Sequence, residues 1–252
     1  MQRNTSFNIF FTNIQRLNIE SVVHNPTCMP SVVILHQNFF ALRNEYLWSL
    51  RRVISYYRFN QVREPISRTA SNFHYSIDSN LRREKALKVL ENRRLDRCGC
   101  YNMSYSSCVV SASKYNCPKN QLLMSGMLSY FLTTEEGKLY EEERCHSPSY
   151  FLKLAIQRIE KEYVVVGVLE YLAETLYVYE KLLPTFFAHA SEVEIEKVSK
   201  RSTTWHETVS REASDILRSN QCNMAEFMLY SYLVKDLLNK YNNLKTAYDS
   251  QI

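Results

Sequence analysis

One short apolar segment constrains the fold more than any other part of this sequence. Residues 163–169, YVVVGVL, carry no charge and are rich in β-branched side chains, which is typical of a strand buried on both faces of a sheet. The preceding segment 149–162 places its apolar residues on one stripe of a helix. The following segment 171–187 is helical again, with Pro184 near its end. Helix, buried strand and helix in succession predict an α/β fold.

Other segments extend this pattern. Residues 31–40, SVVILHQNFF, and 48–59, which contain VISYYRF, are short β-branched and aromatic runs and predict two more strands. The highly charged segment 81–97 predicts an exposed helix whose basic side chains face either solvent or a polyanion. Further helices are predicted over 66–75, 208–219 and 223–241.

The composition predicts a single domain over 1–252. The chain has only 4 glycines and 6 prolines, and no repeat or low-complexity tract marks a linker. Its most apolar region, 163–190, is interrupted by charged residues, so no membrane span is expected. The N-terminus lacks the apolar core of a signal peptide, so a secretory route would need an entry signal that this sequence does not show.

Charge narrows the range of partners only slightly. The sequence has 31 Lys and Arg against 26 Asp and Glu, a formal net charge of +5. This excess favours an anionic partner, and nucleic acid, lipid, nucleotide and acidic glycan all fit it. An ordinary solvated surface explains the same excess, so the choice depends on the chemistry of particular residues.

Seven cysteines favour disulfides over metal binding. Their spacings do not fit paired CxxC zinc sites, and CGC at 98–100 is too tight for one, so no metal site is predicted. A Cys108–Cys117 bridge would contribute about 2–3 kcal/mol in the chain-entropy model. Glycosylation sequons at Asn4 and Asn102 permit a secretory route, although such triplets also arise by chance.

The segment 61–75, QVREPISRTASNFHY, predicts an anion site. It fits a strand, a turn and a helix that begins at Pro65, with Glu64 or Ser67 near the cap. A helix N-terminus offers backbone N–H groups to an anion, and Arg63 and Ser71 would add a cation and a hydroxyl suited to phosphate. The alternative is that Arg63 forms a surface pair with Glu64 or Asp78.

A second polar segment, 191–204, has the composition of a loop with anion-binding groups. It combines cations with neighbouring hydroxyls, which suits a further phosphate contact and also describes many loops without a ligand. The residues concerned are Lys197, Ser199, Lys200, Arg201, Ser202, Thr203 and Thr204.

Four segments together resemble the family of heparan sulfate 2-O-sulfotransferases and uronyl 2-sulfotransferases. They are 62–75, 108–120 (CVVSASKYNCPKN), 162–187 (EYVVVGVLEYLAETLYVYEKLLPTFF) and 197–204 (KVSKRSTT), and their order and spacing carry the resemblance. It implies a P-loop-like sulfotransferase fold, with a central, mainly parallel sheet flanked by helices. It also implies the sulfate donor 3′-phosphoadenosine 5′-phosphosulfate (PAPS), a glycosaminoglycan acceptor, a trimeric assembly and a Golgi-lumenal enzyme on a type II membrane anchor.

The resemblance also implies roles for particular residues. Arg63 and Ser71 match the pair that holds the 3′-phosphate of the donor. Segment 197–203 matches the loop that closes over the adenosine diphosphate, with Ser199, Lys200, Arg201 and Thr203 as donor contacts. Cys108 and Cys117 resemble a family disulfide. Cys145 resembles half of another, and because Leu132 stands at its usual partner's position, Cys98 or Cys100 would replace that partner.

His36 resembles the catalytic histidine of the family. That histidine removes the proton from the 2-hydroxyl of a uronic acid as the oxygen attacks sulfur. A side chain with a pKa near neutrality suits general-base catalysis, which is typically worth about 10²–10⁴ in rate. Without the resemblance, one histidine near a strand is more often structural. The family carries a second histidine two residues earlier, and Ile34 stands there.

The start of the sequence departs from the family pattern. The segment NTSFNIFF resembles the end of the loop that wraps the donor's 5′-phosphate, so Thr5 and Ser6 are predicted phosphate contacts, and the first strand and part of this loop are missing. Met1 then stands where the family has a catalytic lysine. Either an N-terminal piece is lacking or the chain is a decayed relative with little activity, and the joint absence of strand, stalk and anchor favours the first.

The sequence thus predicts an enzyme that transfers sulfate from PAPS to a uronic acid of heparan sulfate or of dermatan or chondroitin sulfate. The alternative is a sulfotransferase-like pseudoenzyme that binds glycosaminoglycan or nucleotide without turnover. A P-loop kinase is disfavoured because no GxxxxGK[ST] motif occurs. No nucleic-acid partner is expected.

Overall fold

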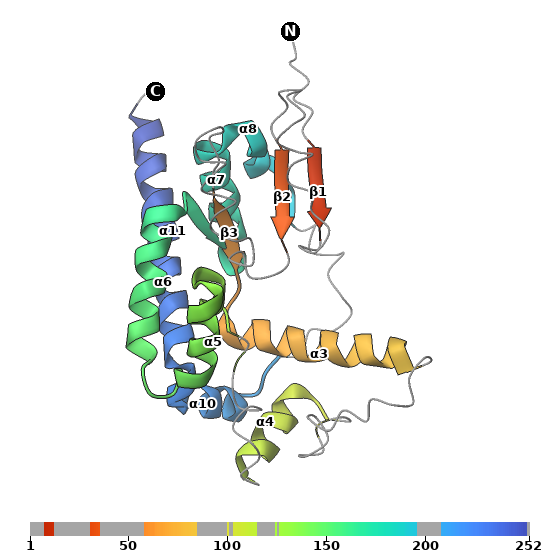
Figure 1. Ribbon diagram of the computed structural model, residues 1–252. Coiled ribbons are helices and arrows are strands. Elements are labelled where there is room, and N and C mark those ends of the chain that lie inside the picture. The colour runs from red at the N-terminus through yellow and green to blue at the C-terminus, as the bar shows by residue number, and fades with distance from the viewer. Residues whose placement is uncertain are drawn as a thin grey trace.

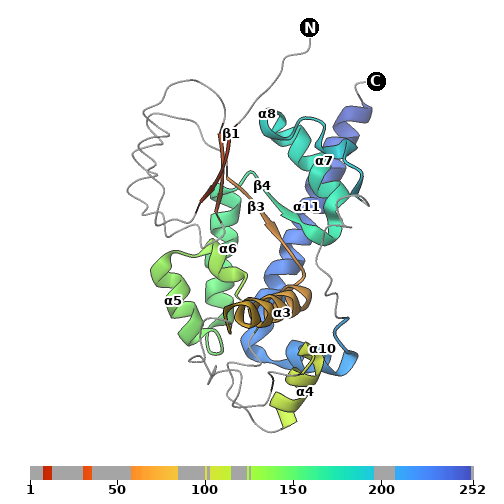
Figure 2. The same ribbon diagram turned by 90° about the vertical axis from the view of Figure 1, so that its right-hand side faces the viewer.

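The computed structural model describes residues 8–12, 31–35, 58–84, 100, 103–114, 124, 126–195 and 208–250, with side chains described from residue 58 onward except for 75–84. Helices make up most of this part of the chain, and the strands form two parallel pairs. Helices α6, α7 and α11 lie beside strands β3 and β4, and α3, α4 and α10 lie at one end of that assembly (Figures 1 and 2).

Both strand pairs are parallel. Strand β1 (Asn8–Thr12) pairs with β2 (Ser31–Leu35), and β3 (Phe59–Val62) pairs with β4 (Val165–Val168). Strands predicted within 31–40 and 163–169 are therefore confirmed as β2 and β4. The strand predicted over 48–59 overlaps β3 only at Phe59, and residues 48–57 lie outside the described part. A single central sheet stays a prediction, because the described strands pair two by two.

Helix α7 (Leu172–Leu182) packs on β4 so closely that one position requires glycine. A Cβ atom at Gly167 would lie 2.3 Å from the Thr175 side chain and 2.6 Å from the Tyr179 hydroxyl. That hydroxyl donates a hydrogen bond of 2.6 Å to the backbone oxygen of Asn60 in β3. The glycine thus lets one helix contact both strands of the pair.

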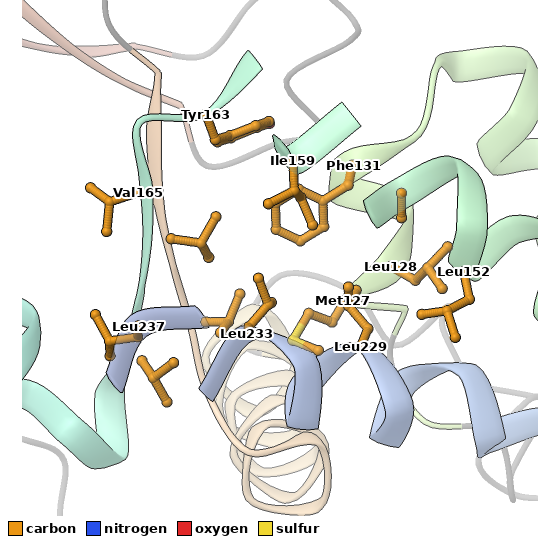
Figure 3. Close-up of a cluster of buried hydrophobic side chains, with 14 of the residues drawn as sticks. Met127, Leu128, Phe131, Leu152, Ile159, Tyr163, Val165, Leu229, Leu233 and Leu237 are labelled. Carbon is orange, nitrogen blue, oxygen red and sulfur yellow. The ribbon is translucent and has the colours of Figure 1, made fainter. Parts of the chain in front are cut away.

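The larger hydrophobic cluster forms between β4, helix α6 (Pro148–Glu162) and helix α11 (Met224–Asp249). Leu229, Leu233 and Leu237 follow one another on α11 at helical spacing and are fully buried. Figure 3 shows them facing side chains from β4, α6 and the segment around residue 130. We call this the large cluster, and its members include Val62, Met127, Leu128, Phe131, Phe151, Ile159, Tyr163, Val165, Val168 and Val178.

A smaller hydrophobic cluster joins three helices at the other end of the described part. Helices α3 (Pro65–Glu84), α4 (Tyr105–Lys114) and α10 (Arg211–Ser219) supply it. The helices predicted over 66–75 and 208–219 are confirmed as α3 and α10. We call this the small cluster, and its buried members are Ile66, Ala70, Tyr105, Val109, Met124, Ala213 and Leu217.

Short helices connect these parts. Helix α5 (Thr134–Glu143) begins with a capping box, because the Thr133 hydroxyl accepts from the Glu136 amide and the Glu136 carboxylate accepts from the Thr133 amide. Among the described helices, none combines the length and apolar character needed to cross a membrane. The other short elements are α8 (Pro184–Phe187) and the 3-10 helices η6 (Leu128–Phe131), η7 (Leu169–Tyr171), η8 (Ala190–Glu192) and η9 (Gln221–Asn223).

The described part of the chain contains two disulfides, which agrees with the predicted use of the cysteines but not with the predicted partners. Cys108 pairs with Cys100 rather than Cys117, and Cys145 pairs with Cys222 rather than Cys98 or Cys100. Bridges that close loops of 8 and 9 residues remove almost the same entropy from the unfolded chain. The spacing therefore does not select between Cys100 and Cys117 as the partner of Cys108. The second bridge spans 77 residues, and only the packing of α11 brings its two sulfurs together.

Arg144 joins the two clusters through buried hydrogen bonds. Its Nε donates to the Cys222 carbonyl oxygen at 3.0 Å, and its Nη1 donates to the Met124 carbonyl oxygen at 3.2 Å. The Asn223 side chain accepts from the Met124 amide at 3.0 Å and donates to a backbone oxygen of α10. These contacts fix the Met124 backbone of the small cluster against the start of α11.

Glu226 completes this network from the first turn of α11. Its carboxylate accepts from the Tyr140 hydroxyl at 2.7 Å and from the amides of Met127 and Leu128 at 2.8 and 3.1 Å. Burial raises its pKa, against the opposing effect of these donors and of Arg144, whose Nη2 lies 4.0 Å away. We call Tyr140, Arg144, Asn223 and Glu226 the seam. Since each of these polar side chains has hydrogen-bond partners, the seam has a structural role.

Candidate functional site

A pocket of about 250 Å³ lies at the carboxyl ends of strands β3 and β4. In open α/β sheets, ligands bind outside the carboxyl ends of parallel strands, where the following turns leave a crevice. Figure 1 shows β3 running toward the first turn of α3, so the turn between them borders this pocket. The lining residues are Gln61, Val62, Arg63, Arg68, Met127, Tyr130 and Leu169.

Arg63, the first residue of the predicted anion site, lines this pocket. Its side chain is half-buried and has no hydrogen-bond or ion-pair partner in the described part of the chain. The predicted alternative, a pair with Glu64, is absent there, because Glu64 lies 3.5 Å from Arg218 instead. The side chain of Asp78, the other alternative, lies outside the described residues. Arg63 therefore offers its guanidinium donors to a ligand.

Two of the backbone donors at the start of α3, the amides of Glu64 and Ser67, are already engaged. Glu64 caps the helix, since its Oε2 accepts from the Ser67 amide at 2.7 Å. The Glu64 amide in turn donates to Glu170 Oε1 at 3.0 Å. The expectation that these N–H groups await an anion is therefore wrong for Glu64 and Ser67. Capping by a carboxylate satisfies the helix dipole from within the chain.

Ser71 does not line the pocket. It lies near the second turn of α3 and its side chain is exposed. The structure thus brings Arg63 into the pocket and leaves its predicted partner on the helix surface. The residue on α3 that does line the pocket is Arg68, three positions earlier.

Arg68 and Tyr130 form a pair that the sequence interpretation missed. The Arg68 Nη2 donates to the Tyr130 hydroxyl at 2.6 Å, and its guanidinium carbon lies 4.8 Å from the centre of the Tyr130 ring. Contact with an aromatic ring and a hydrogen bond together restrict the orientation of the guanidinium. The position of Arg68 within REPISR was a signal, but Tyr130 is 62 residues away and its approach depends on tertiary packing.

Two carboxylates lie near the pocket without lining it. Glu170 accepts from the Glu64 amide and, at 3.0 Å, from the Tyr230 hydroxyl. Burial, followed by the charge of Glu170, raises the pKa of Tyr230, so this phenol stays a neutral donor. Both carboxylates have partners of their own, and the two guanidinium groups are the charged groups that line the pocket.

The other predicted site residues lie outside the described part of the chain. These are the catalytic candidate His36 and the donor-binding candidates Thr5, Ser6, Ser199, Lys200, Arg201 and Thr203. Of the basic segment 81–97, only the backbone of 81–84 is described, as the end of α3. Among the described residues, no three His, Cys, Asp or Glu side chains come together as a metal site.

Neither a protein-family model nor a curated protein matches the chain.

Proposed function

We propose that this protein is a PAPS-dependent 2-O-sulfotransferase acting on a uronic acid of heparan sulfate or of dermatan or chondroitin sulfate. One observation carries the proposal: Arg63, selected from the sequence as a phosphate ligand, has no partner in the described structure and lines a pocket at the carboxyl ends of two parallel strands. A guanidinium in that position suits a phosphate group. The P-loop-like sulfotransferase fold is part of the same proposal.

The resemblance assigns the remaining roles. PAPS would supply the sulfuryl group, which passes directly to the acceptor oxygen without a covalent enzyme intermediate. Arg63 would bind a donor phosphate, and Thr5, Ser6, Ser199, Lys200, Arg201 and Thr203 are the further proposed donor contacts. His36 would accept the proton of the acceptor hydroxyl.

The disulfides support the proposed location. Disulfides persist mainly in oxidising compartments, and the residues that the structure describes form two of them. We therefore propose the Golgi lumen as the location of the enzyme. Its acceptor would be a polyanionic glycan, which the net charge of +5 favours and the basic segment 81–97 would help to attract. A homo-oligomer is part of the proposal.

Calorimetry on the disulfide-bonded protein tests donor binding. Adenosine 3′,5′-bisphosphate, the product form of the donor, should bind, and Arg63→Ala should weaken that binding about 10–100-fold, the effect of losing a charge-assisted hydrogen bond. Arg211→Ala is the matched control, because Arg211 lies on α10 with its side chain 96% exposed. Absence of binding by the unaltered protein would overturn the proposal.

Sulfate transfer tests catalysis. Radiolabelled sulfate should pass from PAPS to desulfated heparin, and His36→Ala should slow the transfer about 10²–10⁴-fold if His36 is the base. Equal rates would remove His36 from that role. Retention on heparin without any transfer would instead favour the alternative of a glycan-binding pseudoenzyme.

A further inference from the structure

The Tyr130 hydroxyl is a polar group of the pocket that still has a proton to donate. Its oxygen accepts from Arg68 Nη2 at 2.6 Å. A guanidinium has no acceptor atom, so the hydroxyl cannot donate back to Arg68. Among the residues that the structure describes, no acceptor receives this proton. The hydroxyl therefore keeps its capacity as a donor, at a residue that lines the pocket.

Arg68 holds this hydroxyl in place. Its guanidinium carbon lies 4.8 Å from the centre of the Tyr130 ring, and Arg68 has a further interaction besides those with Tyr130. A hydroxyl that accepts a hydrogen bond from a cation is polarised and becomes a stronger donor to a third group. Arg68 thus acts through Tyr130 and does not need to reach a ligand itself.

Arg63 supplies the charge that attracts an anion. Its half-buried guanidinium has no partner in the described part of the chain and lines the same pocket. Arg63 follows β3 and Tyr130 lies on η6, so the pocket brings together donors from two distant segments. An ionised phosphate carries acceptor oxygens only, and its hydrogen bonds to such donors are charge-assisted.

The rest of the pocket suits the part of a ligand next to the phosphate. Val62, Met127 and Leu169 line it with apolar groups. Sites that enclose a whole small molecule usually measure about 300–1,000 Å³. This pocket measures about 250 Å³ and is somewhat smaller. It therefore fits one phosphate group with the adjoining portion of its ligand.

We propose that the Tyr130 hydroxyl, polarised by Arg68, donates a hydrogen bond to the phosphate group that Arg63 binds. Tyr130 is then a ligand contact, and Arg68 is a positioning residue. That this phosphate belongs to the sulfate donor rests on the proposed function. The contact itself does not, because a simple phosphate monoester also tests it.

Calorimetry on the disulfide-bonded protein measures the affinity for phenyl phosphate and for adenosine 3′,5′-bisphosphate, with phenol as the uncharged control. Tyr130→Phe keeps the ring and removes only the hydroxyl, so it should weaken phosphate binding about 10–100-fold. Arg63→Ala should weaken it by a similar factor, and phenol should not bind. Tyr150→Phe is the matched control and should leave the affinity unchanged, because Tyr150 is 57% exposed on α6 and does not line the pocket.

An Arg68→Ala background separates a direct contact from an indirect one. If the Tyr130 hydroxyl touches the phosphate, Tyr130→Phe should still weaken binding about 3–10-fold in that background, where the hydroxyl is no longer polarised. If Tyr130 only orients Arg68 toward the ligand, Tyr130→Phe should have no effect there, because the two changes would remove the same contact. Thermal unfolding shows whether each variant folds.

Phosphorus NMR gives a second measurement with Arg68 in place. A donor that touches the bound phosphate stabilises the dianion and lowers the second pKa of the phosphate. Bound phenyl phosphate should therefore titrate at a pH about one unit higher in Tyr130→Phe than in the unaltered protein. A loss of packing alone would weaken binding without moving this titration. If the double variant does not fold, this titration decides.

The outcomes separate the two proposals. Binding of either probe that depends on Arg63 and, in both backgrounds, on the Tyr130 hydroxyl supports the contact. Phenyl phosphate alone would support it even if the bisphosphate fails to bind and the sulfotransferase proposal falls. Bisphosphate binding that Tyr130→Phe leaves unchanged, or weakens only while Arg68 is present, overturns the contact and leaves the proposed function standing. If neither probe binds to the unaltered protein, both proposals are wrong.

Discussion

The large and small clusters reach stability in different ways. The large cluster combines a strand that is buried at every position with a long helix, and its members are almost all apolar. The small cluster joins three helices with fewer buried side chains, and the Cys100–Cys108 bridge fastens α4 beside it. A region with little apolar area to bury gains more from a covalent link, which restricts the unfolded chain.

The candidate pocket lies at the boundary between these regions. Val62 belongs to the large cluster and Ile66 to the small one, and Arg63 stands in the turn between them. The direction of the Arg63 side chain therefore depends on how the two clusters are fixed to each other.

Removing the cation of the seam should have the largest effect. Arg144→Ala leaves the buried Glu226 without its nearby positive charge and frees two backbone carbonyl oxygens, so we expect a loss of about 3–5 kcal/mol in the free energy of unfolding. Urea denaturation measures it. The exposed Arg211→Ala should stay within about 0.5 kcal/mol of the unaltered protein. A similar small loss for both variants would show that the seam does not hold the clusters together.

The two disulfides should differ in their contributions. Replacing Cys145 and Cys222 by serine opens a loop of 77 residues and should cost about 4 kcal/mol, whereas replacing Cys100 and Cys108 opens a loop of 8 and should cost about 2.5 kcal/mol. Denaturant unfolding of the two double variants gives both values. A larger loss from the Cys100–Cys108 pair would show that the small cluster depends on its bridge beyond chain entropy.

Glycine substitutions test how tightly the large cluster is packed. Gly167→Ala should destabilise by about 1–3 kcal/mol, because its Cβ would overlap Thr175 and displace the Tyr179 hydroxyl from Asn60. Gly137→Ala is the matched control on α5, where an added Cβ meets nothing within 4 Å, and should stabilise by about 0.5–1 kcal/mol. Equal melting temperatures for the two variants would contradict the close packing of α7 on β4.

The smallest effect at neutral pH is expected for Tyr163→Phe. The Tyr163 hydroxyl is buried without a hydrogen-bond partner in the described structure, so its removal should change the free energy of unfolding at pH 7 by less than about 1 kcal/mol. Burial raises the pKa of Tyr163 to about 12.

The same variant should behave differently in alkali. The folded state favours the neutral phenol, so its contribution is complete below the unfolded pKa of about 10 and is lost as the pH rises toward 12. At pH 11, midway between these values, the unaltered protein should have lost about 1.4 kcal/mol relative to Tyr163→Phe, as measured by unfolding at pH 7 and pH 11. Parallel pH profiles would show that the hydroxyl has access to water.

Local pattern predicted individual elements better than contacts between them. The segment YVVVGVL was expected to be a strand buried on both faces, and β4 is buried at all four positions because its run of apolar residues leaves no polar face. The helices α6, α10 and α11 follow their apolar periodicity in the same way. The predicted cysteine pairings were wrong because spacing along the chain does not determine which cysteines meet in the folded protein.

In the candidate site, too, local pattern predicted single residues better than contacts between distant residues. Arg63 was selected because it follows a strand and precedes Pro65, and the structure places it in the pocket. Ser71 was selected with it, as a hydroxyl on the following helix, yet its side chain is exposed and does not line the pocket. Arg68 was missed because its significance depends on Tyr130, and no local pattern predicts a contact across 62 residues.

Local residue patterns were enough to locate β4 and its flanking helices and to predict an arginine after β3, since periodicity, β-branching and proline act over a few neighbouring residues. Long-range packing settles which cysteines meet, which carboxylate accepts from the Glu64 amide, and which aromatic ring holds Arg68. The physical reason is that these contacts join residues far apart in the chain, and only the burial of the two clusters brings them within bonding distance.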